Sequence, residues 1–253
     1  MSAPMLSIDS LSVSYGRTPA LRKLNLHVHR GEVVCIVGQN GAGKSTTLNA
    51  VAGSMAGRLG SGQITLDGVA LLGKSPETIA RMGVSMVPEG RHVFPDMSVV
   101  ENLKVGTYMR GDSQQALREM ETIFELFPRL HERRNSAAGH LSGGEQQMLV
   151  IGRAVLTGAQ LLMIDEPSLG LAPLVTENVY RALLQLRNKR GLTLLINEQS
   201  TNRVLRYADR IYVLRAGVVR MSGAPGQLHD AEAVREAYFG VSQAAAHDHG
   251  ELV

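Results

Sequence analysis

Apolar and polar positions alternate near the start of the chain and then merge into a continuous apolar run. The alternation covers residues 6–15 (LSIDSLSVSY) and 24–29 (LNLHVH), and this period of two is typical of half-buried strands. The run EVVCIVG at 32–38 predicts a buried strand. Shorter strands are predicted at 62–68 and at 84–87, where a proline ends the apolar stretch. The first part of the chain is therefore predicted to be rich in β-structure.

A helical period of three to four residues follows. One helix is predicted from Lys44 to a stop at Gly53, and another begins at Ser75, where a serine cap precedes a proline and an acid. From about residue 95 to 156 the helical period dominates. It is clearest at 98–109, 113–127 and 143–156. Strand patterns return at 159–165, 191–197 and 210–219, with helical stretches between them.

This order of elements predicts one α/β domain over about residues 5–240, with a helical subdomain at about 95–156. The sequence has no internal repeat and no low-complexity linker that would mark a second domain. The tail 241–253 is predicted to be flexible. Its His247, Asp248 and His249 could in principle bind a metal, but a frayed terminus is favoured.

Composition and charge exclude several functions. Of the 253 residues, 26 are Lys or Arg and 23 are Asp or Glu, a net charge of +3, which is too small to indicate nucleic acid but leaves an anionic ligand open. The single cysteine, Cys35, excludes an internal disulfide. No apolar run approaches the roughly 18 residues that cross a bilayer, and the first ten residues lack the features of a signal peptide. A membrane role is therefore expected to depend on a partner.

The strongest chemical signal is the octapeptide Gly38-Gln39-Asn40-Gly41-Ala42-Gly43-Lys44-Ser45, which fits the phosphate-loop pattern G-x-x-x-x-G-K-[ST]. It follows an apolar strand and opens a helix, as this motif requires. Glycines let backbone N–H groups turn around phosphate oxygens, and the helix start adds a favourable dipole. Lys44 is predicted to reach the β- and γ-phosphates, and the Ser45 hydroxyl to bind Mg²⁺. The motif predicts a nucleoside triphosphatase.

Two acids, Asp165 and Glu166, end the apolar strand LLMIDE. Ligands in α/β sheets bind at the carboxyl ends of the strands. Asp165 is predicted to hold Mg²⁺ through water, and Glu166 to polarise the attacking water as a general base. Strands often end in an acid, so the pattern gains its weight from the phosphate loop.

The heptapeptide LSGGEQQ at 141–147 has two interpretations. Ser142 and Glu145 have the spacing of a capping box before a helix. The glycines between them are poor helix formers, and their presence is explained if bare N–H groups must approach an anion. A chain with one phosphate loop and a second anion-binding helix start suggests sites that form across a dimer.

In order and spacing, GQNGAGKST, LSGGEQQ and LLMIDEPS resemble the nucleotide-binding subunit of ATP-binding cassette (ABC) transporters over about residues 5–240. The resemblance implies an α/β P-loop NTPase fold, with a mixed core sheet, an N-terminal antiparallel β-subdomain and a helical subdomain that carries LSGGEQQ. It also implies ATP and Mg²⁺ as cofactors. Adenine would stack on Tyr15, for which a core position on its strand is the alternative.

The resemblance assigns further roles by position. The nucleotide would contact the whole phosphate loop and Thr46, while Ser142, Gly143 and Gly144 would contact the γ-phosphate held by a partner subunit. Two subunits would sandwich two ATP molecules head to tail and drive attached membrane subunits, without nucleic acid. The chain would be a peripheral protein at the cytoplasmic face of the plasma (inner) membrane.

Several departures from the common family pattern are similar to one subgroup, the LivF-type ATPases of branched-chain amino acid importers. Glu89 in VPEGR stands where most members have glutamine, Gln199 where most have histidine, and Ala172 where most have aspartate. The segment LFPRLHERR points to the same subgroup. The resemblance implies a second, non-identical ATPase as partner, although a homodimer is possible. It further implies two permease subunits and, indirectly, a periplasmic or extracellular binding protein.

Glu89 and Gln199 lead to two mechanistic hypotheses. Glu89 keeps an oxygen for Mg²⁺, and we expect it to sense Mg-nucleotide and to signal to a permease-facing groove; a plain soluble turn is the alternative. Gln199 is a candidate catalytic residue that can donate a hydrogen bond to the γ-phosphate but cannot become cationic. We predict that ATP is hydrolysed more slowly at this chain's phosphate loop than at the partner's site. The alternative is that glutamine replaces histidine without effect.

Other functions remain open at this point. An ABC ATPase of another membrane complex, such as a lipid or lipopolysaccharide exporter, normally has the glutamine and histidine that this chain lacks. An ABC ATPase without a transport role normally has a long coiled-coil insertion or a second cassette. A basic cluster predicts either a solvated face or a docking surface for an acidic partner; it consists of Arg129, His131, Arg133 and Arg134.

Overall fold

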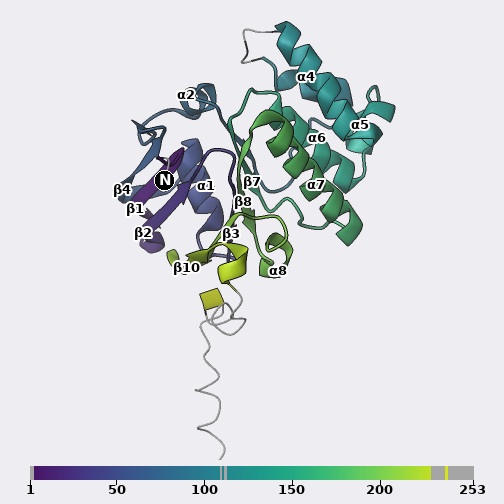
Figure 1. Cartoon of the computed structure of the whole chain (residues 1–253). Coiled ribbons are helices and arrows are strands. Elements are labelled where there is room, and N and C mark those ends of the chain that lie inside the picture. The colour runs from purple at the N-terminus through teal and green to yellow at the C-terminus, as the bar shows by residue number, and fades with distance from the viewer. Residues whose placement is uncertain (1–2, 109, 111–112, 229–236, 239–253) are drawn as a thin grey trace, which may run out of the picture.

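The computed structural model of the chain describes residues 3–108, 110, 113–228 and 237–238 (Figure 1). Its strands are β1 (Leu6–Tyr15), β2 (Thr18–Val28), β3 (Val33–Val37), β4 (Arg58–Leu66), β5 (Val69–Ala70), β6 (Val84–Val87), β7 (Leu161–Asp165), β8 (Thr193–Glu198), β9 (Arg210–Arg215) and β10 (Val218–Gly223). Its α-helices are α1 (Lys44–Ala52), α2 (Pro76–Arg81), α3 (Val99–Val105), α4 (Ser113–Leu126), α5 (Pro128–Glu132), α6 (Gly143–Val155), α7 (Pro173–Arg190) and α8 (Thr201–Val204), and short 3-10 helices lie at Ala138–His140 and Pro225–Gln227.

The alternating segments near the N-terminus form an antiparallel sheet in the order β2-β1-β4-β5. Leu6, Ile8, Leu11 and Val13 of β1 are buried, while the polar residues between them are partly or fully exposed. This sheet is the purple and dark-blue part of Figure 1, next to α1. The predicted antiparallel β-subdomain is confirmed.

The continuous apolar runs form a second sheet in the order β10-β9-β3-β8-β7-β6. The pairs β9-β3-β8-β7-β6 are parallel and β10 is antiparallel to β9, so the core sheet is mixed, as predicted. Along β3, Cys35 belongs to one hydrophobic cluster, and its neighbours Val34 and Ile36 belong to the other. Burial on both faces explains why these strands do not alternate with polar residues.

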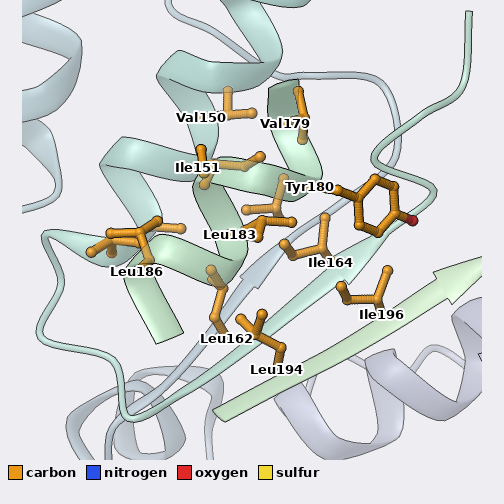
Figure 2. Close-up of a cluster of buried hydrophobic side chains, with 14 of the residues drawn as sticks. Val150, Ile151, Leu162, Ile164, Val179, Tyr180, Leu183, Leu186, Leu194 and Ile196 are labelled. Atoms are coloured by element: carbon orange, nitrogen blue, oxygen red, sulfur yellow. The ribbon is translucent and has the colours of Figure 1, made fainter. Parts of the chain in front are cut away.

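Helices α6 and α7 cover one face of the core sheet (Figure 2). Ile151 of α6 and Leu183 of α7 pack above Ile164 of β7 and Ile196 of β8. On the opposite face, Leu48 and Val51 of α1 share a cluster with the first sheet. Because α6 packs on the sheet, the LSGGEQQ segment is attached to the same core that carries the nucleotide motifs.

The segment 210–219, which has the pattern of one strand, is in fact a hairpin of β9 and β10. Ala216 and Gly217 form its turn with φ of 49° and 77°, and the sequence pattern hides this turn because apolar stretches lie before Arg215 and after Gly217. The Gly217 N–H donates to the Ala42 carbonyl (2.9 Å), and the Gly217 carbonyl accepts from the Arg22 N–H (2.9 Å). The hairpin turn is therefore hydrogen-bonded to the phosphate loop at Ala42.

Three parallel strands end at one edge of the core sheet. Val37 of β3 pairs with Glu198 of β8, and Asp165 of β7 pairs with Asn197 of β8. The residues that follow these strand ends are the phosphate loop, Glu166 and Gln199. The register of the sheet thus brings together three segments that lie far apart in the sequence.

Candidate functional site

Two glycines of the phosphate loop are required by close backbone packing. A Cβ at Gly38 would lie 2.2 Å from the Leu214 carbonyl oxygen, and one at Gly43 would lie 2.8 Å from the Ala20 carbonyl oxygen. Gly43 also has a φ of 107°, which favours glycine. It caps α1 without any side-chain hydrogen bond. The first amides of α1 are thereby left to other acceptors.

The loop opens into a pocket of about 550 Å³. Nearly all residues expected to contact nucleotide line it, together with Glu89, Glu166 and Gln199; the full set is Tyr15, Thr18, Pro19, Ala20, Gln39, Asn40, Gly41, Ala42, Gly43, Lys44, Ser45, Thr46, Glu89, Glu166, Leu169 and Gln199. Tyr15 is 40% exposed and is therefore not a core tyrosine. Gly38 and Asp165 do not line this pocket.

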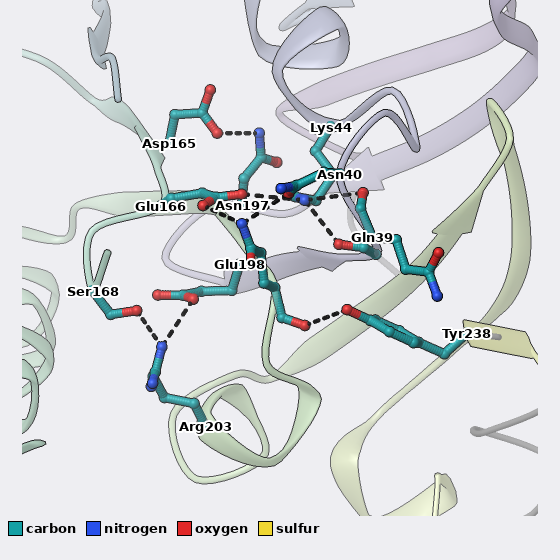
Figure 3. Close-up of polar contacts among 12 residues, drawn as sticks. Gln39, Asn40, Lys44, Asp165, Glu166, Ser168, Asn197, Glu198, Arg203 and Tyr238 are labelled. Atoms are coloured by element: carbon teal, nitrogen blue, oxygen red, sulfur yellow. Dashed lines mark hydrogen bonds and ion pairs between the residues drawn. The ribbon is translucent and has the colours of Figure 1, made fainter. Parts of the chain in front are cut away.

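Lys44 and Gln199 each hold one carboxylate oxygen of Glu166; Figure 3 labels Lys44, Asn40 and Glu166 among the residues of this site. The Lys44 Nζ lies 3.2 Å from Glu166 Oε1, and the Gln199 Nε2 donates to Glu166 Oε2 at 2.8 Å. Lys44 also donates to the Gly38 carbonyl (2.8 Å), and Gln199 to Asn40 Oδ1 (2.8 Å). Glu166 has a φ of 49°, a left-handed conformation that costs a non-glycine residue about 1 kcal/mol and is concentrated at functional sites.

Asp165 lies deeper than Glu166. It is 4% exposed, and its Oδ1 accepts a hydrogen bond from Asn197 Nδ2 (3.0 Å). The Asn197 Oδ1 is buried without a hydrogen-bond partner among the described residues. The Asn197 amide therefore fixes the Asp165 carboxylate at the end of β7; its role at Mg²⁺ stays a prediction.

The oxygen atoms around the pocket fit a magnesium ion that arrives with a nucleotide. Ser45 and Glu89 are both exposed and line the pocket. Within the described ranges, no group of three or more His, Cys, Asp or Glu side chains is placed to hold a metal. Magnesium is usually bound by one or two carboxylates together with phosphate oxygens and water, and this donor set has that composition.

The LSGGEQQ segment starts α6 with a complete capping box. The Ser142 Oγ accepts from the Glu145 N–H (3.4 Å), and the Glu145 Oε2 accepts from the Ser142 N–H (2.8 Å). Ser142, Gly143 and Gly144 do not line the pocket of their own chain. A Cβ at Gly144 would lie 2.3 Å from Val175 Cγ1 of α7, so close helix packing is one reason for this glycine.

The first glycine of the segment, Gly143, faces the VPEGR turn. A Cβ at Gly143 would lie 2.5 Å from Nη1 of Arg91. Gly90 and Arg91 have φ of 95° and 67°, which bends the chain so that Glu89 lines the pocket while the Arg91 guanidinium covers the start of α6. The turn thus lies at the pocket through Glu89 and at the start of α6 through Arg91.

The basic cluster is partly neutralised within the chain. Arg129 lies 2.6 Å from Glu132 and 3.6 Å from Glu145, and Arg133 lies 3.6 Å from Glu145. Burial alone would raise the pKa of Glu145, but hydrogen bonds from Ser142 and the two arginines hold its pKa below the usual value. The cluster therefore supports the capping box of α6.

Sequence reasoning missed the pocket residues Thr18, Pro19, Ala20 and Leu169. The first three lie at the start of β2, just after the turn that joins it to β1. Recognising a β1–β2 hairpin in the sequence would have placed these residues opposite the end of β1, next to Tyr15. Leu169 belongs to the turn after Glu166, where its N–H donates to the Glu166 carbonyl (3.1 Å).

A buried polar network behind the pocket was also not foreseen. Glu198, 2% exposed, accepts a hydrogen bond from the Tyr180 hydroxyl (2.8 Å) and pairs with Arg203 (3.4 Å). Arg203 also donates to the Ser168 hydroxyl. Burial, and then the charge of Glu198, raise the pKa of Tyr180. The network joins the end of β8 to the segment after Glu166.

Comparison with known proteins gives consistent matches. The family model for ABC transporters matches residues 21–169. The chain is 44% identical, over 93% of its length, to the whole of BraG, a high-affinity branched-chain amino acid transport ATP-binding protein of Pseudomonas aeruginosa. It is 32% identical, over 94% of its length, to 99% of LivF of Archaeoglobus fulgidus, a probable protein of that kind.

Solved structures agree with these matches. A crystal structure of the ADP conformation of an ATP-binding cassette from an ABC transporter superposes with a TM-score of 0.83 at 27% identity. The superposition covers 95% of this chain and 100% of that one. A nucleotide-free ATP-binding cassette from an ABC transporter gives a TM-score of 0.80 at 26% identity over 94% of this chain and 100% of that one.

Proposed function

Because this chain belongs to the ABC transporter family of ATPases, we propose that it energises a membrane importer of branched-chain or related amino acids. The names of BraG and LivF support this class of substrate. The observation that carries the proposal is the pocket beside the phosphate loop, in which Lys44 and Gln199 both contact Glu166. We take residues 5–240 as one cassette with a helical subdomain at about 95–156; the tail 241–253 lies outside the described residues.

In this proposal the pocket binds ATP. Tyr15 stacks on adenine, and the amides from Gly38 to Thr46 surround the phosphates. Lys44 exchanges its ion pair with Glu166 for the β- and γ-phosphates. Glu166, released from Lys44, accepts a proton from the attacking water, while Gln199 donates a hydrogen bond to the γ-phosphate.

When bound with the nucleotide, magnesium would neutralise negative charge on the phosphates. The Ser45 hydroxyl would be its ligand from the phosphate loop. Glu89 would be a second oxygen ligand, and Asp165 would act through water. The exposure of Ser45 and Glu89 in the pocket supports these roles.

We further propose a head-to-tail pair with a second ATPase, a different chain or a second copy of this one. Ser142, Gly143 and Gly144 would contact the γ-phosphate of the nucleotide held by the partner. Their position outside their own pocket supports this role. The sandwich would drive two permease subunits and, through them, a periplasmic or extracellular binding protein.

The permeases would hold the chain at the cytoplasmic face of the inner membrane. In the part of the chain that the structure describes, no helix has the length and hydropathy to cross a membrane. An apolar groove of about 290 Å³ lies next to Glu89, and Ile79, Val84, Met86 and Pro88 are among its lining residues. This groove supports the proposal that a permease docks there. Glu89 would connect this groove to the nucleotide.

Reconstitution tests the proposed function. The chain would be copurified with its membrane subunits and placed in proteoliposomes, and ATP-dependent uptake of radiolabelled leucine would be measured. We expect uptake with the wild type and none with Glu166→Gln, while Glu77→Gln, which changes an exposed acid paired with Arg81, behaves as the wild type. The importer proposal would be overturned if ATP turnover were coupled to outward movement of lipid. It would also be overturned if the chain hydrolysed ATP but had no permease partner.

The hypothesis for Glu89 has its own test. Glu89→Gln should keep ATP turnover in the isolated chain within a few-fold, because the amide keeps an oxygen for Mg²⁺. It should change the ratio of substrate transported to ATP hydrolysed in the assembled transporter. If the substitution leaves both turnover and this ratio unchanged, Glu89 is only a soluble turn residue.

A further inference from the structure

Tyr238, a tyrosine near the C-terminal end of the described chain, contacts the backbone of the pocket residue Gln199. Ala237 and Tyr238 pack against the hydrophobic cluster beneath α6 and α7. The Tyr238 hydroxyl donates to the Gln199 carbonyl oxygen at 2.8 Å (Figure 3). This contact joins residues that lie 39 positions apart.

Gln199 needs such support because it lies between regular elements. Strand β8 ends at Glu198, and α8 begins at Thr201, so the Gln199 backbone belongs to neither. Ser200, the N-cap of α8, makes no side-chain capping hydrogen bond. The side-chain amide of Gln199 nevertheless has to bridge Asn40 and Glu166, at 2.8 Å from each.

Glu198, the residue before Gln199, is held by the side chains of the buried network, whereas the backbone of Gln199 is held by Tyr238. Glu198 is held by Tyr180 and Arg203. The Tyr238 hydroxyl then holds the next carbonyl along the chain. A carbonyl that is held at a constant position limits the rotation of the Gln199 backbone and so restricts where its side-chain amide can point.

The electrostatics of Tyr238 agree with this geometry. Burial, and then the negative charge of Glu166, raise the pKa of Tyr238. A phenol ordinarily ionises near pH 10, so Tyr238 remains a proton donor at physiological pH.

We propose that Tyr238 is a positioning residue for ATP hydrolysis, acting through its hydrogen bond to the Gln199 carbonyl. It does not line the pocket and acts on the nucleotide only through Gln199. The inference rests on the proposed function of the pocket. It adds that Tyr238, which lies beyond β10 in the sequence, takes part in setting the rate of this site.

Tyr238→Phe in the full chain is the test, because it removes the donor and keeps the ring. We expect kcat for ATP to fall about fivefold, the factor that corresponds to one lost hydrogen bond, with KM for ATP nearly unchanged. Tyr207→Phe is the matched control. The Tyr207 ring stacks on Tyr180 (4.6 Å), but its hydroxyl has no hydrogen-bond partner among the described residues, so kcat should stay at the wild-type value.

A double-mutant cycle separates positioning from general destabilisation. In a Gln199→Ala background, Tyr238→Phe should have no further effect on kcat, because the side chain that it positions is gone. Equal losses of kcat in both backgrounds would overturn the proposal. A rise in KM with unchanged kcat, or the same loss of kcat in Tyr207→Phe, would also overturn it.

Hydrogen exchange gives a readout that does not depend on turnover. The amides of about residues 199–204 should exchange faster in Tyr238→Phe than in the wild type or Tyr207→Phe. Unchanged exchange there would contradict the proposal even if the wild type showed no turnover. The absence of wild-type turnover would count against the proposed function of the pocket instead, so the two failures are distinguishable.

Discussion

The two glycine-marked helix starts of this chain, at α1 and at α6, are built in opposite ways. Gly43 caps α1 in a left-handed conformation and offers no side-chain acceptor to the first amides. Ser142 caps α6, and both hydrogen bonds of its capping box with Glu145 are formed. The α1 start lines the pocket of about 550 Å³, while Ser142, Gly143 and Gly144 at the α6 start do not line that pocket.

This difference teaches that the two starts depend on a bound anion to different degrees. The first amides of α1 lack a side-chain acceptor, and a phosphate is the natural acceptor for them. The start of α6 is stabilised by its own cap, a contribution of about 1 kcal/mol. We therefore expect changes at the α1 side to act within one chain and changes at the α6 start to act only in an assembled pair.

The largest effect is expected from Glu166→Gln on the α1 side. Loss of the general base should lower kcat for ATP by about 10²–10⁴-fold. Nucleotide binding should persist, because Lys44 and the phosphate-loop amides are unchanged. Steady-state hydrolysis and titration with a fluorescent ATP analogue measure the two quantities in the isolated chain. Loss of binding together with turnover would show that Glu166 organises the loop instead of the water.

The next effect is expected from Gly143→Asp at the start of α6. The three atoms nearest to a Cβ there belong to the tip of the Arg91 side chain, which can move, so the chain should fold. The new carboxylate would repel the partner's γ-phosphate, and turnover of the assembled pair should fall by about 10²-fold, as for a lost oxyanion donor. ATP binding to the isolated chain should not change. If binding to the isolated chain fell as well, the two helix starts would not be independent.

The starts of both helices were predictable from sequence because local rules fix them. A phosphate loop carries its own signature, and Ser142 and Glu145 have capping-box spacing. What the sequence could not reveal is which contacts hold each start in place. The Leu214 carbonyl behind Gly38 and the Val175 methyl against Gly144 come from segments far away in the chain.

The pairing of strands shows the same limit. Period-two and continuous apolar runs predict that strands exist, yet the β9–β10 turn at Ala216 and Gly217 is hidden within an apolar stretch. Likewise, nothing in the sequence around Tyr238 indicates its contact with Gln199, since the chain has to pass β9 and β10 before it returns to the pocket. Such contacts depend on sheet order, which local patterns do not determine.

A smaller effect is expected from Gln199→Ala, which also concerns the α1 side. The substitution removes the amide that bridges Asn40 and Glu166, and hydrolysis at this chain's own loop should slow about tenfold, the factor for a lost hydrogen bond to a charged group. Single-turnover hydrolysis, with each site of the pair inactivated in turn, measures this rate. In the wild type this site should already be slower than the partner's. No effect of the substitution, or equal rates at the two sites, would contradict the prediction.

The smallest effect is expected from Glu145→Gln, which tests whether α6 is stable through its own cap. Glutamine can still accept the hydrogen bond from the Ser142 N–H but loses the charge that Arg129 and Arg133 stabilise, so unfolding at pH 7 should require about 0.5–1 kcal/mol less. Since the pKa of Glu145 is lowered in the folded chain, the wild-type advantage is present above about pH 4.3, the ordinary glutamate value. It should disappear as the pH falls from there through the lower, folded pKa. Urea unfolding at several pH values measures the difference; an advantage that persists at still lower pH would mean that shape rather than charge makes the cap.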